Sequence, residues 1–261
     1  MSEMPEVVKA KLIKNIEVAP KYYKIKLACS SIAKRARPGQ FLEVKVSNTY
    51  EPLLRRPLGI NRVNGASIEI LYEVVGRGTE ILSQRKPGEY LDVIGPLGNG
   101  FSLPSTINHQ PSTILVAGGM GVAPLVFLAE KLAKGKGLVL IGAKTKRQIL
   151  CEKEFKDFGF RVKVATDDGS RGFKGKVTDV LKHLLSTIDY RLSTIYGCGP
   201  RPMLKRIAQI SGEYNIPAQI SLEEHLACGI GACLGCVIDT KQGYKRVCKE
   251  GPVFNAQEII W

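Results

Sequence analysis

Four cysteines near the C-terminus constrain the fold of this chain more than any other feature of its sequence. They follow the spacing C-x4-C-x2-C-x11-C, at Cys228, Cys233, Cys236 and Cys248. This is the plant-type spacing of four thiolates that hold a [2Fe–2S] cluster. Glycines between the first three cysteines let the backbone adopt positive φ and bring N–H groups close to sulfur. The motif therefore predicts a chain that carries electrons one at a time.

Zinc, disulfides and free thiols are the alternatives for these cysteines. Structural zinc sites usually combine two C-x2-C pairs far apart, whereas here a C-x4-C overlaps a C-x2-C. Disulfides are disfavoured because residues 1–18 contain no apolar signal-peptide core. The cluster is favoured, and zinc is the first alternative. Cys29 and Cys151 lie outside the motif and are expected to be buried thiols.

The charge and hydropathy of the chain indicate its compartment and the partners that it can bind. No stretch approaches roughly 18 apolar residues, so no membrane span is expected, and the lack of a signal sequence predicts a cytoplasmic protein. The formal net charge is +14. Because the lysines are scattered and form no basic helix or stripe, nucleic-acid binding is not expected. Anionic dinucleotides or an acidic partner surface fit this charge, and a generally lysine-rich proteome explains it equally well.

The chain divides into three predicted units. Residues 1–103 contain short alternating or β-branched runs, Pro-Gly turns and one helical stretch near 79–84, which predicts a small antiparallel barrel. Residues 104–218 begin with a proposed linker at 104–111 and then alternate strands with helices, which predicts a parallel sheet covered on both faces. The expected helices are 123–133, 147–158, 177–185 and 201–214. Residues 219–261 are too short and glycine-rich for a large core of their own, so the cluster would hold them together.

Two glycine-rich turns end strands of the second unit and begin helices. Their candidate residues are Gly118, Gly119 and Gly121 in the first turn, and Cys198, Gly199 and Pro200 in the second. Helix N-termini attract pyrophosphate, and two strand ends on one parallel sheet form a crevice where nucleotides bind. These residues are therefore candidates for a nicotinamide nucleotide, with Cys198 beside the nicotinamide ring. The first turn is not the standard G-x-G-x-x-G, and tight turns without a ligand are the alternative.

Two further candidates for phosphate binding lie in the first unit. Arg56, before Pro57 at the expected end of a strand, presents a cationic fork suited to phosphate. Residues 76–79 follow the strand ILYEVV and begin a short helix, whose backbone N–H groups suit a second phosphate. A barrel with two such turns before a nucleotide-binding domain is suited to a flavin, although Arg56 alone would also fit a solvated turn.

Five motifs occur in a fixed order across residues 50–200: RRPLG, ILYEVVGRGT, DVIGPLGNGF, GGMGVAPL and YGCGP. In this order they resemble the ferredoxin–NADP reductase superfamily, in which a flavin-binding antiparallel barrel precedes a nicotinamide-nucleotide domain. The cysteine segment contains EEHLACGIGACLGCV and YKRVCKEGPVF. It narrows the resemblance to the electron-transfer subunits of class B dihydroorotate dehydrogenases. The resemblance covers essentially the whole chain.

This resemblance implies which residues bind the cofactors. The family's flavin motif, Arg-Pro-x-Ser, maps onto Arg56, Pro57, Leu58 and Gly59. The family's second flavin-binding segment maps onto Leu71, Tyr72 and Glu73, and its third maps onto Gly78 and Thr79. The cluster ligands map onto the four cysteines of the motif without departure. Gly59 replaces the family serine, which removes one hydroxyl hydrogen bond to the flavin, worth on the order of 1 kcal/mol.

The resemblance also implies a function in pyrimidine (UMP) biosynthesis. Electrons from the FMN of a dihydroorotate dehydrogenase catalytic subunit would pass through the [2Fe–2S] cluster and FAD of this chain to NAD+. No general acid or base is needed, so no catalytic residue is expected here. The same resemblance implies a heterotetramer of two copies of each subunit. One alternative is a flavin and iron–sulfur NAD(P)H reductase serving ferredoxin, a hydrogenase or a sulfur-reducing partner, and another is a redox-sensing module that binds nucleic acid.

Two features allow more than one interpretation. Asp167 and Asp168 follow a strand. A negative pair there would repel a ribose 2′-phosphate and favour NAD over NADP. Alternatively, the two residues form only a solvated turn. Trp261 is the only tryptophan. It is expected to pack against a partner subunit or against its own cluster unit, and a frayed terminus is equally consistent with the sequence.

Overall fold

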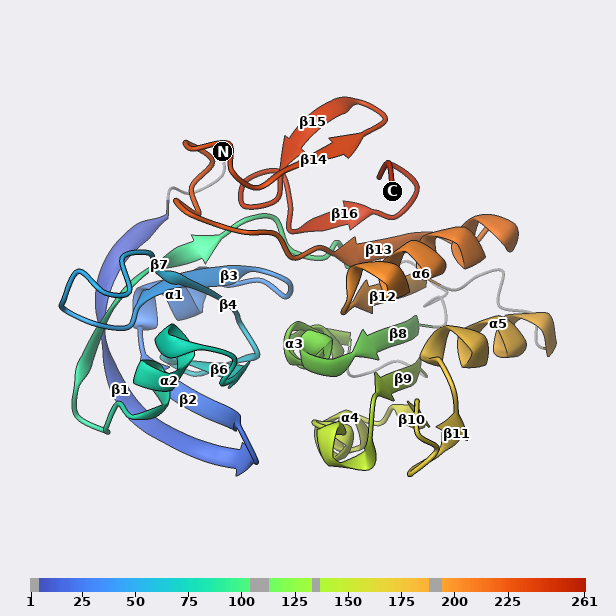
Figure 1. Cartoon of the computed structure of the whole chain (residues 1–261), viewed down its shortest axis with the longest axis horizontal. Coiled ribbons are helices and arrows are strands. Elements are labelled where there is room, and N and C mark those ends of the chain that lie inside the picture. Colours follow the sequence, from blue (N-terminus) through green and yellow to red (C-terminus); the bar gives the residue numbers. More distant parts are fainter. Residues whose placement is uncertain (1–4, 104–112, 133–136, 188–193) are drawn as a thin grey trace.

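The computed structural model describes residues 5–103, 113–132, 137–187 and 194–261. Figure 1 shows a curled sheet on the left, a second sheet with helices on both faces on the right, and the cysteine segment above them. This arrangement confirms the fold class expected from the sequence. The linker expected at 104–111 and the helix end expected at Ala133 lie outside the described residues. No helix in the described parts is long and apolar enough to cross a membrane.

The first part is an antiparallel sheet of seven strands that curls into a barrel. Its strands are β1 (Glu6–Ala19), β2 (Tyr22–Ala28), β3 (Phe41–Lys45), β4 (Arg56–Gly59), β5 (Arg62–Asn64), β6 (Ser67–Glu73) and β7 (Tyr90–Leu97). They lie in the order β4-β3-β7-β1-β2-β6-β5, and two short helices, α1 (Ser30–Arg35) and α2 (Arg77–Ser83), accompany them. Alternate residues point inward, as Leu42 and Val44 on β3 do, and form the barrel core.

The sequence pattern misses α1, β4 and β5, and β4 matters most for the site. Arg56 begins this strand, whereas the sequence places it at the end of one. The strand has only four residues, which is too short for alternation to reveal it. Pro57 is tolerated there because β4 lies at the edge of the sheet and pairs only with β3, so its missing N–H breaks no second ladder.

The second part is a mostly parallel sheet in the order β11-β10-β9-β8-β12-β13-β16. Its strands are β8 (Thr113–Gly118), β9 (Gly137–Ala143), β10 (Arg161–Thr166), β11 (Phe173–Lys174), β12 (Thr194–Cys198), β13 (Ala218–Ser221) and β16 (Val253–Asn255). Its helices are α3 (Val122–Leu132), α4 (Glu152–Asp157), α5 (Val177–Thr187) and α6 (Arg201–Glu213). Figure 1 shows α3 and α4 on the face toward the barrel and α5 and α6 on the other face, as expected for a doubly covered sheet.

The prediction of a helix at 147–158 is wrong for the first half of that range. A 3-10 turn, η2 (Lys146–Gln148), is followed by extended backbone at Ile149 and by a left-handed residue, Cys151, with φ 59°. Only then does α4 begin. The extended stretch places Leu150 in the core at 8% exposure, so burial of this side chain outweighs the helical propensity of the segment.

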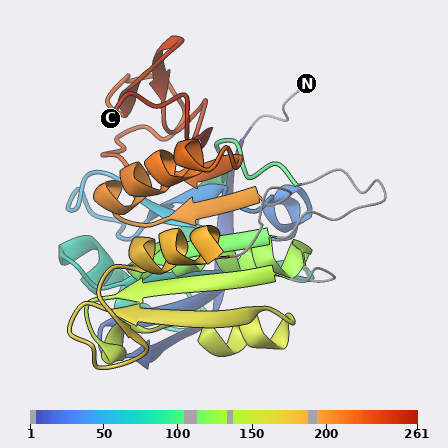
Figure 2. The same cartoon turned by 90° about the vertical axis from the view of Figure 1, so that its right-hand side faces the viewer.

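The C-terminal segment packs against both larger parts. Its strands β13 and β16 extend the second sheet, and between them β14 (Val237–Thr240) and β15 (Gly243–Arg246) form a hairpin. On the barrel side, the backbone N–H of Asn99 donates to the carbonyl of Gly251 at 2.6 Å. Figure 2 shows the segment above α6. The expected boundary between residues 218 and 219 falls inside β13, so the division into three units stays a prediction.

One side chain of the second part belongs to the core of the first. Phe127 lies on α3 and is 1% exposed, and it packs into the barrel core together with residues such as Leu82 and Ile60. The ion pair between Arg62 of the barrel and Glu130 of α3, at 2.6 Å, lies on the same helix face. The two larger parts therefore share apolar core contacts, which also include Tyr22 and Leu71 of the barrel in the core around α3.

We expect Phe127→Ala to destabilise both larger parts together, by about 3–5 kcal/mol, because it leaves a cavity in a shared core. Chemical denaturation followed by far-UV circular dichroism measures this loss. Phe173→Ala is the matched control, since Phe173 is 50% exposed on β11. Equal midpoints for the two variants would contradict the shared core.

Candidate functional site

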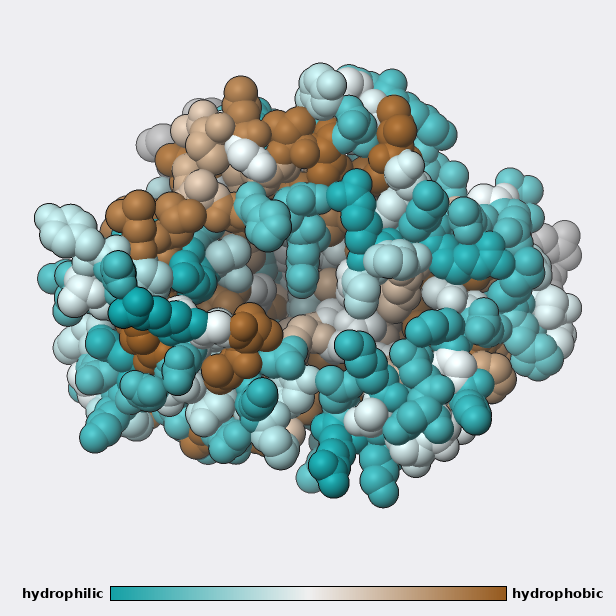
Figure 3. Space-filling model, viewed as in Figure 1, coloured by the Kyte–Doolittle hydropathy of each residue, from teal (hydrophilic) through white to brown (hydrophobic). Residues whose placement is uncertain are grey.

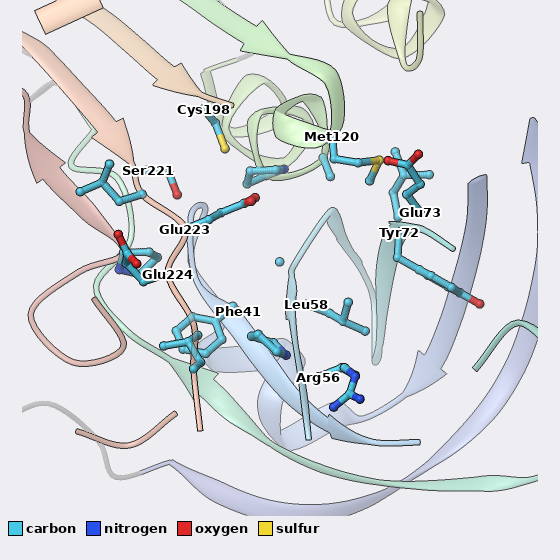
Figure 4. Close-up of a pocket in the computed structure, with 18 of the residues that line it drawn as sticks. Phe41, Arg56, Leu58, Tyr72, Glu73, Met120, Cys198, Ser221, Glu223 and Glu224 are labelled. Atoms are coloured by element: carbon cyan, nitrogen blue, oxygen red, sulfur yellow. The ribbon is translucent and has the colours of Figure 1, made fainter. Parts of the chain in front are cut away.

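A cavity of about 470 Å³ lies between the barrel and the carboxyl edge of the parallel sheet. This volume is in the usual range of small-molecule sites. Figure 4 shows Arg56 and Leu58 on one side of it and Cys198, Met120 and Glu223 on the other. Of the nine residues expected to bind flavin, all except Gly78 line this cavity. The fold thus brings the flavin candidates together with Cys198 of the second glycine-rich turn.

The two elements expected to bind phosphate meet at one place in the barrel. The guanidinium of Arg56 passes over Gly78 on α2, where any Cβ would collide with its Nε and Cζ atoms. Its Nη1 donates to the carbonyls of Leu54 at 2.6 Å and Arg55 at 3.2 Å, which fixes the direction of the fork. A cationic fork beside the first turn of a helix offers both charge and N–H groups to one phosphate.

Hydrogen bonds fix two further flavin candidates, Tyr72 and Thr79. The Tyr72 hydroxyl donates to Oδ1 of Asn15 at 3.2 Å, and its ring stacks on Tyr23 with 5.8 Å between the centroids. Burial raises the pKa of Tyr72, so the phenol stays neutral. The Thr79 hydroxyl accepts from the backbone N–H of Gly76 at 3.3 Å and closes the turn before α2. Figure 4 shows the Tyr72 ring pointing away from the cavity, and this ring packs in the barrel core. Tyr72 therefore supports the barrel wall of the cavity from behind.

The two glycine-rich turns lie next to each other at the carboxyl edge of the sheet. The first, η1 (Gly119–Gly121), follows β8, and the second follows the neighbouring strand β12. They approach so closely that a Cβ on Gly121 would overlap the carbonyl group of Cys198. Gly119 has φ 53° and open space at its Cα, so the backbone is open to a ligand there. The other candidates enclose the contact between the turns: Gly118, Gly199 and Pro200.

Cys198 points its sulfur into the cavity and is 1% exposed. Burial raises the pKa of this thiol well above its usual range, so it is neutral at physiological pH. A neutral, fully packed thiol is a poor nucleophile and a compact surface for a planar ring. This position suits contact with a cofactor more than covalent chemistry.

Sequence reasoning missed the residues that the C-terminal segment contributes to the cavity. Ser221 ends β13, and Glu223 and Glu224 come shortly after it. The carboxyl end of β13 reaches the same edge of the sheet as β12. Glu224 pairs with Arg201 at the start of α6, with 2.6 Å between Oε1 and Nη1. A parallel strand at 218–221 would have predicted these residues, because ligands bind at the carboxyl ends of such strands. The glycine-rich stretch that follows obscured this strand.

The cysteine loop directs backbone N–H groups at sulfur. Distances of 3.3 to 3.4 Å join Ala232 N and Cys233 N to Cys228 Sγ, Gly235 N to Cys233 Sγ, and Cys248 N to Cys236 Sγ. Burial acts to raise the pKa of Cys228, but the backbone N–H groups around it lower this pKa to about 6. The thiolate is the form that binds metal, so the loop favours ligation.

The arrangement of the four cysteines also bears on the choice between iron–sulfur and zinc. Within the ranges that the structure describes, no three His, Cys, Asp or Glu residues gather closely enough to hold a single ion. A structural zinc needs four ligands around one ion, whereas each iron of a [2Fe–2S] cluster takes two cysteines. The choice between the two metals therefore rests on the spacing of the cysteines, which favours the two-iron cluster. Of the two thiols that lie outside both the motif and the cavity, Cys29 is buried and Cys151 is half-buried.

The residues for which the sequence allows two interpretations, Asp167, Asp168 and Trp261, do not line the cavity. Asp167 pairs with Lys176 at 3.0 Å, and Oδ1 of Asp168 accepts from the backbone N–H of Ser170 at 2.9 Å and from its hydroxyl. Both carboxylates are thus engaged within their own turn. Trp261 packs against the core that the second sheet shares with the cysteine segment, so it contacts its own unit.

Two family models match the chain. The iron–sulfur cluster binding domain of dihydroorotate dehydrogenase B matches residues 223–260, and an oxidoreductase NAD-binding domain matches residues 115–209. Among curated proteins, the electron transfer subunit of dihydroorotate dehydrogenase B (NAD(+)) from Desulforamulus reducens is 42% identical and covers 99% of this chain and 100% of its own length. The Fusobacterium nucleatum subunit of the same name is 39% identical, over 94% of this chain and 95% of its own length.

Solved structures agree with these matches. An NADH-dependent reduced ferredoxin–NADP oxidoreductase superposes with a TM-score of 0.84 at 28% identity, over 100% of this chain and 92% of its own. A ferredoxin–NADP+ reductase from Neisseria gonorrhoeae, with bound FAD and NADP, has a TM-score of 0.68 at 15% identity, over 80% of this chain and 91% of its own. At that identity, the second likeness shows the fold alone.

We expect Gly59→Ser to tighten FAD binding about five-fold, because a new hydroxyl hydrogen bond contributes about 1 kcal/mol. The position accepts a side chain, since a Cβ at Gly59 would have no atom within 4 Å. Quenching of FAD fluorescence on titration with apoprotein measures the affinity. Gly59→Ala is the control, because it adds the Cβ without the hydroxyl. If both variants bind FAD equally, the hydroxyl makes no contribution.

Proposed function

Because this chain belongs to the family of dihydroorotate dehydrogenase B electron transfer subunits, we propose that it carries electrons from a catalytic partner to NAD+. The partner holds FMN and oxidises dihydroorotate, a step of pyrimidine (UMP) synthesis. The supporting observation is that one cavity joins the barrel, the nucleotide sheet and the cysteine segment. A flavin bound there supplies the exchange between single electrons and hydride, which nicotinamide alone cannot perform.

We propose a residue assignment that follows the positions of the candidates. The FAD site comprises Arg56, Pro57, Leu58, Gly59, Leu71, Tyr72, Glu73, Gly78 and Thr79. The NAD site comprises Gly118, Gly119, Gly121, Cys198, Gly199 and Pro200, and the cluster ligands are Cys228, Cys233, Cys236 and Cys248. Arg56 holds a phosphate at the start of α2, and Tyr72 supports the barrel wall of the FAD site from behind. The three-unit division at residues 103 and 218 belongs to the same proposal.

The catalytic subunit is proposed to dock over the cysteine loop. Cys233 is exposed there. Around it, Ile230 is 48% and Leu234 60% exposed, and in the loop before β4 Leu53 is 79% exposed. Figure 3 shows apolar side chains gathered over this upper left region. Leu234 also has φ 60°, a strained conformation for a leucine, and such strain concentrates at functional surfaces.

The assembly and location of the protein are proposed from the family. Two copies of this chain with two catalytic subunits form the expected heterotetramer. A cytoplasmic location is favoured because none of the seven cysteines forms a disulfide, as is usual in a reducing compartment. A reductase serving ferredoxin, a hydrogenase or a sulfur-reducing partner is the second candidate, and the oxidoreductase at 28% identity favours it. The relatives at about 40% identity over nearly the whole chain favour the dihydroorotate partner more strongly.

We expect NADH to bleach the flavin and then the cluster in the isolated chain, because hydride must enter at the flavin before single electrons can leave. Anaerobic visible absorbance during NADH addition follows both centres. The Cys233→Ser variant is the control, since it should lose the cluster response and keep the flavin response. A flavin that stays oxidised under excess NADH would refute the nicotinamide assignment.

We expect Leu53→Glu to weaken binding of the catalytic subunit about ten-fold or more, because a charge would be buried in an apolar interface. Reduction of the variant chain's own flavin by NADH should not change. Biolayer interferometry against the immobilised catalytic subunit measures the affinity. Phe173→Glu introduces the same charge on exposed β11 and serves as the control. The docking face is wrong if the two variants bind alike.

A further inference from the structure

A buried carboxyl group without a partner lies between the barrel and the cysteine loop. Glu43 is on β3 and is 1% exposed, and its neighbours Leu42 and Val44 point into the barrel core while it points outward. Neither of its carboxyl oxygens has a hydrogen-bond partner among the described residues. Buried polar groups are nearly always paired, so an unpaired carboxyl group requires a specific explanation.

The cysteine loop is what covers this carboxyl group. Gly229, directly after the proposed ligand Cys228, rests on the side chain of Glu43 so closely that a Cβ at 229 would lie 2.7 Å from Oε1 and even closer to Cγ. Gly229 also has φ 67°, which favours glycine. The loop can therefore lie on β3 only because residue 229 has no side chain.

The nearby arginines are engaged with other groups. Nη2 of Arg55 pairs with Asp92 at 2.8 Å, and its Nη1 donates to the carbonyl of the same residue. Arg56 donates to the carbonyls of Leu54 and Arg55. Both arginines act on Glu43 only through space and lower its pKa, whereas burial, the largest effect, raises this pKa to about 7.

Glu43 lies next to residues of both proposed cofactor sites. Phe41, two residues earlier on the same face of β3, lines the cavity. Pro57, the residue opposite Glu43 on β4, lines it too. On its other side Glu43 contacts the loop that begins at Cys228. One side chain thus lies with the flavin candidates on one side and the first cluster ligand on the other.

We propose that Glu43 is a positioning residue that sets how closely the Cys228–Gly229 backbone packs on β3 and keeps the reduction potential of the cluster low. This inference rests on the proposed function. The potential of an iron–sulfur cluster depends on nearby charge, on hydrogen bonds to sulfur and on solvent exposure. A carboxylate in a poorly solvated position disfavours the added electron, because its charge is weakly screened there. A low cluster potential favours onward transfer toward the flavin and NAD+.

The test is an anaerobic redox titration of the full, cofactor-loaded chain at mildly alkaline pH, where carboxyl groups are ionised. Electron paramagnetic resonance of the reduced cluster gives its midpoint potential, and visible absorbance gives that of the flavin. Glu43→Gln removes the charge and keeps the shape. Asp239→Asn is the control, since it removes one charge from an exposed position on β14 of the same segment.

We expect Glu43→Gln to shift the cluster potential upward and to alter the resonance line shape, with a smaller shift at the flavin and none in Asp239→Asn. Wild-type cluster potential and line shape in Glu43→Gln would overturn the proposal, because Glu43 would then only fill space. If Glu43→Gln holds no cluster, Glu43→Asp is the deciding variant. A cluster that Glu43→Asp holds at the wild-type potential supports the role of the charge. Loss of the cluster from both variants overturns the proposal. A wild-type chain that NADH reduces but that lacks a cluster resonance refutes the proposed function itself, and the role of Glu43 with it.

Discussion

The packing of the C-terminal segment against both larger parts is the constraint on which the rest of the molecule depends. Electrons pass between two centres only when these are held close together, and a segment of about forty residues with a small core of its own cannot hold a position alone. Strand β16 fixes it to the parallel sheet through β13, and the hydrogen bond from Asn99 to Gly251 fixes it to the barrel. The contact between Gly229 and Glu43 then places Cys228, the first proposed ligand, close to the flavin candidates.

Close backbone approach is the means by which the cavity is built. The two glycine-rich turns touch where Gly121 meets the Cys198 carbonyl group, and Arg56 crosses α2 where Gly78 has no side chain. Each contact brings together two elements that are far apart in sequence. The consequence is one cavity with a cationic end beside Arg56 and a neutral thiol at Cys198, which matches an anionic dinucleotide with a planar ring.

Local sequence signals predict those parts of the fold that local physics determines. The spacing of the cysteines and the strand–turn–helix pattern at the two glycine-rich turns predict the cluster segment and the doubly covered sheet. The short strand β4 and the break at Cys151 could not be predicted, because pairing with β3 and burial of Leu150 decide them. Ser221, Glu223 and Glu43 could not be predicted from the sequence either. They reach their positions at the two sites only when the C-terminal segment folds back on the other parts.

The most direct test of this account is an anaerobic visible spectrum of the chain co-expressed with the catalytic subunit, taken before and after addition of dihydroorotate. If this chain carries electrons from the catalytic subunit to NAD+, a flavin band and a broad iron–sulfur shoulder both bleach with dihydroorotate and return on addition of NAD+. Flavin and cluster that do not respond to dihydroorotate, but are reduced by NADH, would contradict the assigned electron donor.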